Sequence, residues 1–336
     1  MIQKPEISVI IPFFNAKETL DRAIRSISNQ CFSNFECILI DNNSTDNSIG
    51  IANSVCNIDK RFKLITETKQ GVMFANNTGC SIANGKYIAR MDADDEALPN
   101  RLKMQFQFLE KNKNFDVVTG LVNYMPHKTN TEGFARYVDW VNSLPNYEAI
   151  FNQRFIDAPV INPSTMWRKT VGDKYGLYQS GDFPEDYEMW LRWMSNGIKI
   201  GKVNEKILNW YDSDIRLTRT HKIYRDEAFY TIKAKYLTAY LKKVNPHYPK
   251  VAIWGASRIS RKWINLLEQN NIEISFYIDT KKERQLDKPV IYYKDIPGSD
   301  DCFILILMKH QILRKQIHNF LIAKDYSEGK NFLHLS

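Results

Sequence analysis

The sequence predicts an α/β protein with an open, mainly parallel sheet and helices on both faces. Short apolar strands alternate with helical segments from residue 7 to about residue 125, which is the rhythm of consecutive βαβ units. Aspartates end two of these strands, and ligands of such folds bind at the carboxyl ends of parallel strands. The same alternation restarts after residue 249, so we expect a second, smaller α/β domain.

Each element is indicated by its own apolar pattern. Continuous β-branched or apolar runs favour buried strands, and apolar residues three and four apart favour helices. Asn15 and Glu18 have capping-box spacing before the first helix, and Pro99 is suited to start a later one. The expected strands lie at 7–11, 35–40, 62–66, 87–91, 116–125, 251–254, 274–278, 290–293 and 303–308. The expected helices lie at 20–27, 50–56, 71–83, from 99, near 138, from 184 to 197, at 259–269 and at 312–323.

Composition limits the class and the compartment of the protein. The 336 residues are 43% hydrophobic, as in a globular protein, and the net charge of +8 favours anionic partners without selecting one. Five scattered cysteines indicate reduced thiols rather than a disulfide framework. The N-terminus does not resemble a signal peptide, and no apolar run reaches the roughly 18 residues of a membrane span. We therefore expect a cytoplasmic protein, soluble or at the inner face of the membrane.

A cluster of carboxylates follows the strand at 87–91. Asp92 and Asp94 point to the same side of an extended chain, and Asp95 begins the next loop. Unpaired carboxylates this close repel one another, whereas a divalent cation with oxygen ligands would keep them ionised. The alternative is a solvated acidic turn. Glu185 and Asp186 form a second acidic pair in the first turn of a helix, where the helix dipole alone also favours them.

Four motifs in order resemble the family 2 glycosyltransferases, inverting enzymes of GT-A fold, over residues 7 to about 220. They are Ile10 to Asn15, Ile40 to Asp46, Asp92 to Asp95, and Glu185 with Asp186. The resemblance implies that Asp41 binds the nucleoside of a nucleotide-sugar and that Asn42 stands where many relatives have a second aspartate. It also implies that Pro12, Phe13 and Asn15 lie beside the base. Turn capping is the alternative for Asp41.

The resemblance further implies a metal-dependent reaction. Asp94 would hold Mn²⁺ or Mg²⁺ against the diphosphate of the nucleotide-sugar. Asp92 would bind the ribose, or the metal through water, and Asp95 would support them. Asp186, with Glu185 as its neighbour, would be the base that deprotonates the acceptor hydroxyl. Ser164 would line the acceptor side, and Arg216 would approach the diphosphate, although a solvated charge run explains Arg216 equally well.

We expect three parts in the chain: a GT-A domain at 1–221, a connector helix and linker at 222–249, and a Rossmann-like domain at 250–336. Gly255 and Asp279 resemble half of a nucleotide site, but Ser257 and Ser260 replace the further glycines of a dinucleotide fingerprint. A bound nucleotide, a scaffold role and dimerisation stay open for this domain. Aromatic and lysine residues between Tyr224 and Lys243 suit either an interfacial helix on anionic lipid or a packed connector.

The first functional hypothesis is an inverting transferase that moves one sugar, from a UDP-sugar, to a glycan or lipid-linked acceptor in surface polysaccharide biosynthesis. Peripheral membrane contact and a homodimer are left open, and no nucleic acid is expected. The second hypothesis is an NAD-linked oxidoreductase or epimerase activity in the C-terminal domain. The third is a catalytically silent scaffold or binding protein.

Overall fold

The computed structural model describes residues 4–127, 132–214, 216–255, 257, 260–281 and 285–336. The chain divides into two compact units. The first comprises Met1–Ile150 and Val160–His221, and the second comprises Phe151–Pro159 and Lys222–Ser336. A short segment of the N-terminal half thus belongs to the second unit, which the linear sequence does not reveal. The expected α/β class is confirmed for both units.

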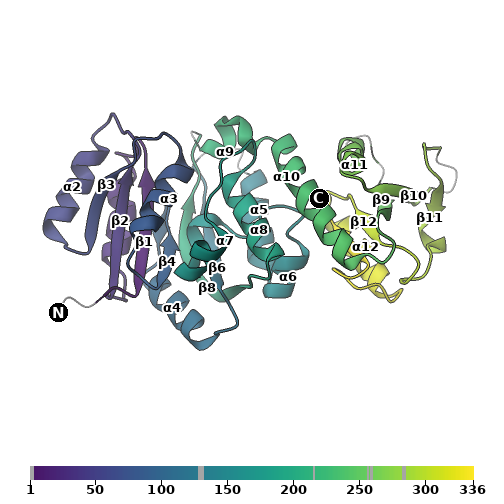
Figure 1. The fold of residues 1–336 in the computed structure, drawn as a ribbon, viewed down its shortest axis with the longest axis horizontal. Coiled ribbons are helices and arrows are strands. Elements are labelled where there is room, and N and C mark those ends of the chain that lie inside the picture. Colours follow the sequence, from purple (N-terminus) through teal and green to yellow (C-terminus); the bar gives the residue numbers. More distant parts are fainter. Residues whose placement is uncertain (1–3, 128–131, 215, 256, 258–259, 282–284) are drawn as a thin grey trace. The chain divides into compact units, whose positions relative to one another are not determined.

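The first unit is built on an eight-stranded mixed sheet of order β3-β2-β1-β4-β7-β6-β8-β5 (Figure 1). Strands β3, β2, β1 and β4 are parallel neighbours, and β7 is antiparallel to both β4 and β6. Every residue of β1, β2 and β4 is buried, as their continuous apolar runs predict. The strands are β1 (Ile7–Phe13), β2 (Phe35–Asp41), β3 (Phe62–Thr66), β4 (Tyr87–Arg90), β5 (Glu96–Ala97), β6 (Val117–Met125), β7 (Met166–Arg168) and β8 (Ile200–Tyr211).

Helices connect these strands and cover the sheet. Gly79 of α3 shows how closely the layers pack, because a Cβ there would lie 2.7 Å from Ile40 Cδ1 of β2 and 2.8 Å from Ile10 Cγ2 of β1. The α-helices of this unit are α1 (Leu20–Ser28), α2 (Ser48–Ile58), α3 (Val72–Ile82), α4 (Arg101–Lys111), α5 (Glu132–Ser143), α6 (Tyr147–Asn152), which continues into the second unit, α7 (Lys169–Tyr175), α8 (Glu185–Ser195) and α9 (Leu217–Thr220). Asn162–Ser164 form a short 3₁₀ turn before β7.

One local expectation was wrong, and strand β8 was not predicted. The capping box does not form: Thr19 is the N-cap of α1 without a side-chain capping hydrogen bond, and the Asn15 side chain accepts hydrogen bonds from Thr45 instead. Strand β8 was missed, because its middle residues, Glu205 among them, are polar and exposed. Its two ends are buried by pairing with β6 and β5, which is a tertiary effect.

The second unit contains a five-stranded, wholly parallel sheet of order β11-β10-β9-β12-β13. Its core gathers Trp254, Ile304 and Phe332, among other buried residues. The strands are β9 (Lys250–Trp254), β10 (Glu273–Asp279), β11 (Val290–Tyr292), β12 (Ile304–Ile306) and β13 (Phe332–His334), and the helices are α10 (Asp226–Val244), α11 (Ser260–Gln269) and α12 (Gln311–Ile322). Single 3₁₀ turns lie at Lys222–Tyr224 and Tyr293–Asp295. The likeness to Rossmann modules stays a prediction.

Helix α10 packs within the second unit. Tyr230 lies against Trp263 of α11 at a ring distance of 4.7 Å, and Tyr240 contacts Phe155 at 6.1 Å. Lys233 is buried, and its ammonium donates a 2.6 Å hydrogen bond to the carbonyl of Ile156. These contacts favour the packed-connector interpretation of this helix. Among the described helices, none is long and apolar enough to cross a membrane.

Candidate active site

The acidic loop after β4 brings three carboxylates together. One oxygen each from Asp92, Asp94 and Asp95 lies within 4.8 Å of the others. Asp95 is fully buried, and its Oδ1 accepts a 3.0 Å hydrogen bond from the Tyr211 amide. Its Oδ2 is buried without a hydrogen-bond partner in the described part of the chain. An orphaned anionic oxygen beside two further carboxylates fits an oxygen-ligated divalent cation better than it fits a solvated turn.

The electrostatic environment of this loop also favours a bound divalent cation. Burial, and then the negative charges of neighbouring aspartates, raise the pKa values of Asp94 and Asp95. A divalent cation in contact with the three carboxylates would reverse that effect and keep them ionised. The residues present therefore suit Mn²⁺ or Mg²⁺, with Asp94 and Asp92 as ligands and Asp95 beneath them.

Several arginines lie near the acidic loop. Of these, only Arg216 was predicted from the sequence as a site residue. Arg90 is almost fully buried at the end of β4 and forms an ion pair with Asp92. Although burial acts to lower it, Asp92 raises the pKa of Arg90. Arg22 donates a 2.5 Å hydrogen bond to the Asp94 carbonyl and stacks on Tyr211.

Two further cations act on the same carboxylates from other directions. Arg216 stacks 3.8 Å above the Trp210 ring and favours ionisation of both Asp94 and Asp95. Arg101 of α4 is buried below the loop, where its guanidinium donates 2.5 Å to the Arg90 carbonyl. Burial lowers the pKa of Arg101 to about 9, and Asp95 counteracts this. The arginines offset part of the negative charge, yet the carboxyl pKa values stay raised.

Asp186 lies in the first turn of α8 and belongs to the same electrostatic environment. Burial, and next the carboxylate of Glu185, raise the pKa of Asp186 to about 7, while Arg90 acts against this rise and Asp92 adds to it. The structure therefore brings Asp186 near the acidic loop, although about 90 residues separate them in sequence. A carboxyl group with a pKa near neutrality is suited to accept a proton at physiological pH.

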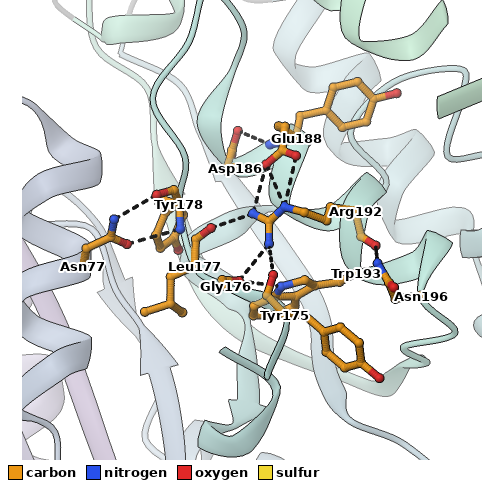
Figure 2. Close-up of polar contacts among 11 residues, drawn as sticks. Asn77, Tyr175, Gly176, Leu177, Tyr178, Asp186, Glu188, Arg192, Trp193 and Asn196 are labelled. Atoms are coloured by element: carbon orange, nitrogen blue, oxygen red, sulfur yellow. Dashed lines mark hydrogen bonds and ion pairs between the residues drawn. The ribbon is translucent and has the colours of Figure 1, made fainter. Parts of the chain in front are cut away.

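A hydrogen-bond network fixes the position of α8 (Figure 2). Arg192 pairs with Glu188 one turn earlier at 3.0 Å. The same guanidinium donates to three consecutive carbonyls at the C-terminal end of α7, those of Tyr175, Gly176 at 2.9 Å and Leu177 at 2.6 Å. The indole of Trp193 adds a 2.9 Å hydrogen bond to the Gly176 carbonyl. Glu188 therefore has a structural role as the (i, i+4) partner of Arg192.

Tyr178 connects this network to α3 and to the 3₁₀ turn at Asn162–Ser164. Its backbone exchanges two hydrogen bonds, of 2.8 and 3.2 Å, with the side chain of Asn77 on α3 (Figure 2). Its buried hydroxyl donates 3.2 Å to Asn162. Burial raises the pKa of Tyr178, and Arg90 counteracts the rise. Sequence reasoning missed Arg90 and Tyr178, since neither lies in a motif and only the fold brings them near Asp186.

The loops after β1 and β2 are linked to each other. Asp41 ends β2 and is almost fully buried, and its Oδ1 accepts a 3.0 Å hydrogen bond from the Ser44 amide. The backbone amide of Asn15, at a φ of 48°, donates 3.1 Å to the Ser44 hydroxyl. These contacts are the turn-capping role that was the alternative for Asp41. Its second oxygen keeps a nucleoside role open, so that role stays a prediction.

Asn42 has a clear structural role. Its amide donates 2.9 Å hydrogen bonds to the carbonyls of Glu67 and Lys69, and its oxygen accepts 2.8 Å from the Gly71 amide. These three contacts tie the β3–α3 loop to the end of β2. A direct contact with nucleotide would require Asn42 to share or release these partners.

The remaining sequence-predicted residues differ in exposure. Pro12 and Phe13 are buried in β1, whereas the next residue, Phe14, is 51% exposed and is the aromatic side chain available there.

Ser164 lies in the core rather than on an acceptor-side surface. It is fully buried, and its hydroxyl lies 2.6 Å from both the Thr119 hydroxyl and the Ile161 carbonyl. The acceptor-side role of Ser164 therefore stays a prediction.

Comparison with known proteins decides the family. The sequence model described as "Glycosyl transferase family 2" matches residues 8–176. The chain belongs to glycosyl transferase family 2. This family 2 chain is 29% identical over 247 residues to an uncharacterized glycosyltransferase of Haemophilus influenzae, covering 71% of this chain and 76% of that one. It is 31% identical to an uncharacterized Rickettsia conorii glycosyltransferase, over 81% of this chain but only 43% of that protein's length. The protein is an enzyme, a glycosyltransferase.

Solved structures show the same fold at low identity. S. aureus TarS, crystallised as residues 1–349 with UDP-GlcNAc, superposes with a TM-score of 0.54 at 16% identity, over 79% of this chain and 80% of that one. The mannosyltransferase PcManGT of Pyrobaculum calidifontis, with GDP-Man and Mn²⁺, gives a TM-score of 0.50 at 14% identity, over 81% and 71%. The expected GT-A fold of this family 2 enzyme is confirmed.

A separate cavity of about 370 Å³ lies in the second unit, at the carboxyl ends of β9, β10 and β12. Asp279 and Ser257 are among its lining residues. Gly255 has a φ of 103°, and a Cβ there would lie 2.5 Å from the Leu307 carbonyl, so close packing alone requires this glycine. Nucleotide binding in the second unit therefore stays a prediction, as does the NAD-linked alternative.

Proposed function

We propose that this enzyme is an inverting, metal-dependent glycosyltransferase that moves a single sugar from a UDP-sugar to a glycan or lipid-linked acceptor in surface polysaccharide biosynthesis. The observation that carries the proposal is the pKa of about 7 at Asp186, in a carboxyl group that senses the charges of both Arg90 and Asp92. This electrostatic link supports a proton acceptor and a cation site that act together.

The proposed reaction is one direct displacement. The Asp186 carboxylate takes the proton of the acceptor hydroxyl as its oxygen bonds to the anomeric carbon, and the bond from that carbon to the diphosphate oxygen breaks. Attack from the face opposite the leaving group inverts the anomeric configuration. A base of this pKa is about half ionised near pH 7, where it still accepts a proton readily.

The other residues hold the donor. A divalent cation held by Asp94 and Asp92 would supply the charge that offsets the leaving diphosphate. Asp41 would accept hydrogen bonds from the nucleoside, and Arg216, stacked on Trp210, would face the diphosphate. TarS forms a complex with UDP-GlcNAc, and PcManGT forms one with GDP-Man and Mn²⁺, which supports a nucleotide-sugar donor here.

Thermal unfolding with a panel of nucleotide-sugars, each with and without Mn²⁺, tests the donor and the cation together. A bound donor stabilises the folded state by about 2.7 kcal/mol at 100 times its Kd. We expect a rise in Tm with a UDP-sugar that needs Mn²⁺. NMR of the transfer product should show the opposite anomer to the donor, and retention of configuration would refute the single displacement.

A further inference from the structure

Two imidazoles and one carboxylate meet in the second unit, away from the acidic loop in sequence. His318 lies on α12, Glu328 lies between α12 and β13, and His334 ends β13. One ligand atom from each lies within 4.8 Å of the other two. Nδ1 of His318 is 3.9 Å from Oε2 of Glu328, and the imidazole rings of His318 and His334 are near-parallel with centroids 5.8 Å apart.

The cluster contains buried polar atoms that lack partners. Among the described residues, none offers a hydrogen bond to Oε1 of Glu328 or to Nδ1 of His334. His334 is only 3% exposed. Buried nitrogen and oxygen atoms are normally paired, because desolvating them without a partner costs free energy. A bound ligand, an ordered water or an ion would pair these two buried atoms.

We propose that His318, Glu328 and His334 bind one Zn²⁺ ion. Two imidazole nitrogens with one carboxylate are a donor set that suits zinc, whereas Mg²⁺ and Ca²⁺ prefer oxygen ligands alone. Zinc ligands lie about 2.0–2.2 Å from the metal, so the three atoms must approach one another more closely than 4.8 Å. The His318 side chain is 34% exposed and has room for that adjustment. A water molecule would complete four-coordination.

Arg314 offers the competing explanation for Glu328. It lies one turn before His318 on α12, and its positive charge lowers the pKa of Glu328, which burial raises to about 7. Arg314 does not pair the buried nitrogen of His334, because Nδ1 of His334 has no hydrogen-bond partner among the described residues. Neutral imidazole nitrogens are the form that binds zinc. Arg314 would therefore weaken zinc affinity without removing the site.

The position of the site indicates what the ion does. β13 is an edge strand that pairs only with β12 in the sheet of the described residues, and α12 precedes it in the chain. A metal bound by residues of both α12 and β13 would hold the helix against this edge of the five-stranded sheet. Because a structural ion binds the folded chain, zinc should raise the Tm of the unfolding transition.

The test uses the full chain carrying Asp92→Asn and Asp94→Asn, so that the first unit has lost its own candidate ligands. Protein stripped with a chelator is titrated with Zn²⁺ against a chromogenic competitor, and retained metal is measured after gel filtration. We expect one Zn²⁺ per chain and a higher Tm. His318→Ala and Glu328→Gln should each weaken binding more than the roughly 10–100-fold cost of losing an outer-sphere partner.

Controls separate this site from other histidines and from Arg314. His310 is exposed in the same unit, so His310→Ala should bind zinc like its parent. Arg314→Gln should bind zinc more tightly. The proposal is overturned if the stripped protein retains no zinc, or if His318→Ala, whose partly exposed position should tolerate alanine, binds zinc as tightly as its parent.

Discussion

Asp186→Asn should separate catalysis from stability. The amide cannot accept the acceptor proton, so transfer should fall by about 10²–10⁴-fold, the usual contribution of a general base. Donor binding should persist, since Asp186 is proposed to act on the acceptor. In the wild type, a base with a pKa of about 7 makes transfer roughly tenfold faster at pH 8 than at pH 6, because its ionised fraction rises by that factor.

The stability of the same variant follows from the raised pKa. The folded state holds a proton on Asp186 up to pH 7, whereas the unfolded chain releases it near the ordinary value of 3.8. The wild type therefore loses stability as pH rises through that window. One pKa unit is about 1.4 kcal/mol, giving about 4 kcal/mol at most, and partial exposure reduces this to about 1–2 kcal/mol. Asp186→Asn should be more stable than wild type by that amount at pH 8.

The assays are nucleoside diphosphate release across pH 5.5–8.5 and urea unfolding at pH 5 and pH 8. Asp173→Asn is the matched control, since Asp173 is an exposed aspartate of α7 and should leave both properties unchanged. Transfer by Asp186→Asn at more than a tenth of the wild-type rate would refute the assignment. So would a wild-type rate that does not change between pH 6 and pH 8.

Three further perturbations test the surroundings of Asp186. Asp94→Asn should abolish the Mn²⁺-dependent rise in Tm with UDP, and an unchanged rise would place the cation elsewhere. Arg192→Met leaves Glu188 buried without its cation and removes the donor to three carbonyls. Urea unfolding should therefore show a free energy of unfolding lower by about 3–5 kcal/mol. A decrease below about 1 kcal/mol would mean that the network is dispensable. Arg90→Met removes a charge that lowers the pKa of Asp186, so the rise of transfer rate with pH should move to higher pH, and a shift to lower pH would contradict the electrostatic link.

Much of the fold was predictable from local sequence patterns. β1, β2 and β4 were predictable because each buries a continuous apolar run, and α1 and α4 because their apolar residues recur at helical spacing. β8 was not predictable, since its central residues are polar and it is held by pairing at both ends. The capping box failed for a related reason: Asn15 satisfies the β2–α2 loop instead of its own helix.

The sequence by itself determined the α/β class, the family resemblance and the choice of Asp92, Asp94 and Asp186 as candidate site residues. Carboxylates at strand and helix ends are local features, so they can be read along the chain. The tertiary structure alone decided that Arg90 and Tyr178 lie near Asp186. It also decided that residues 151–159 join the second unit. Charge interactions and burial depend on distance in space, which a linear pattern does not contain.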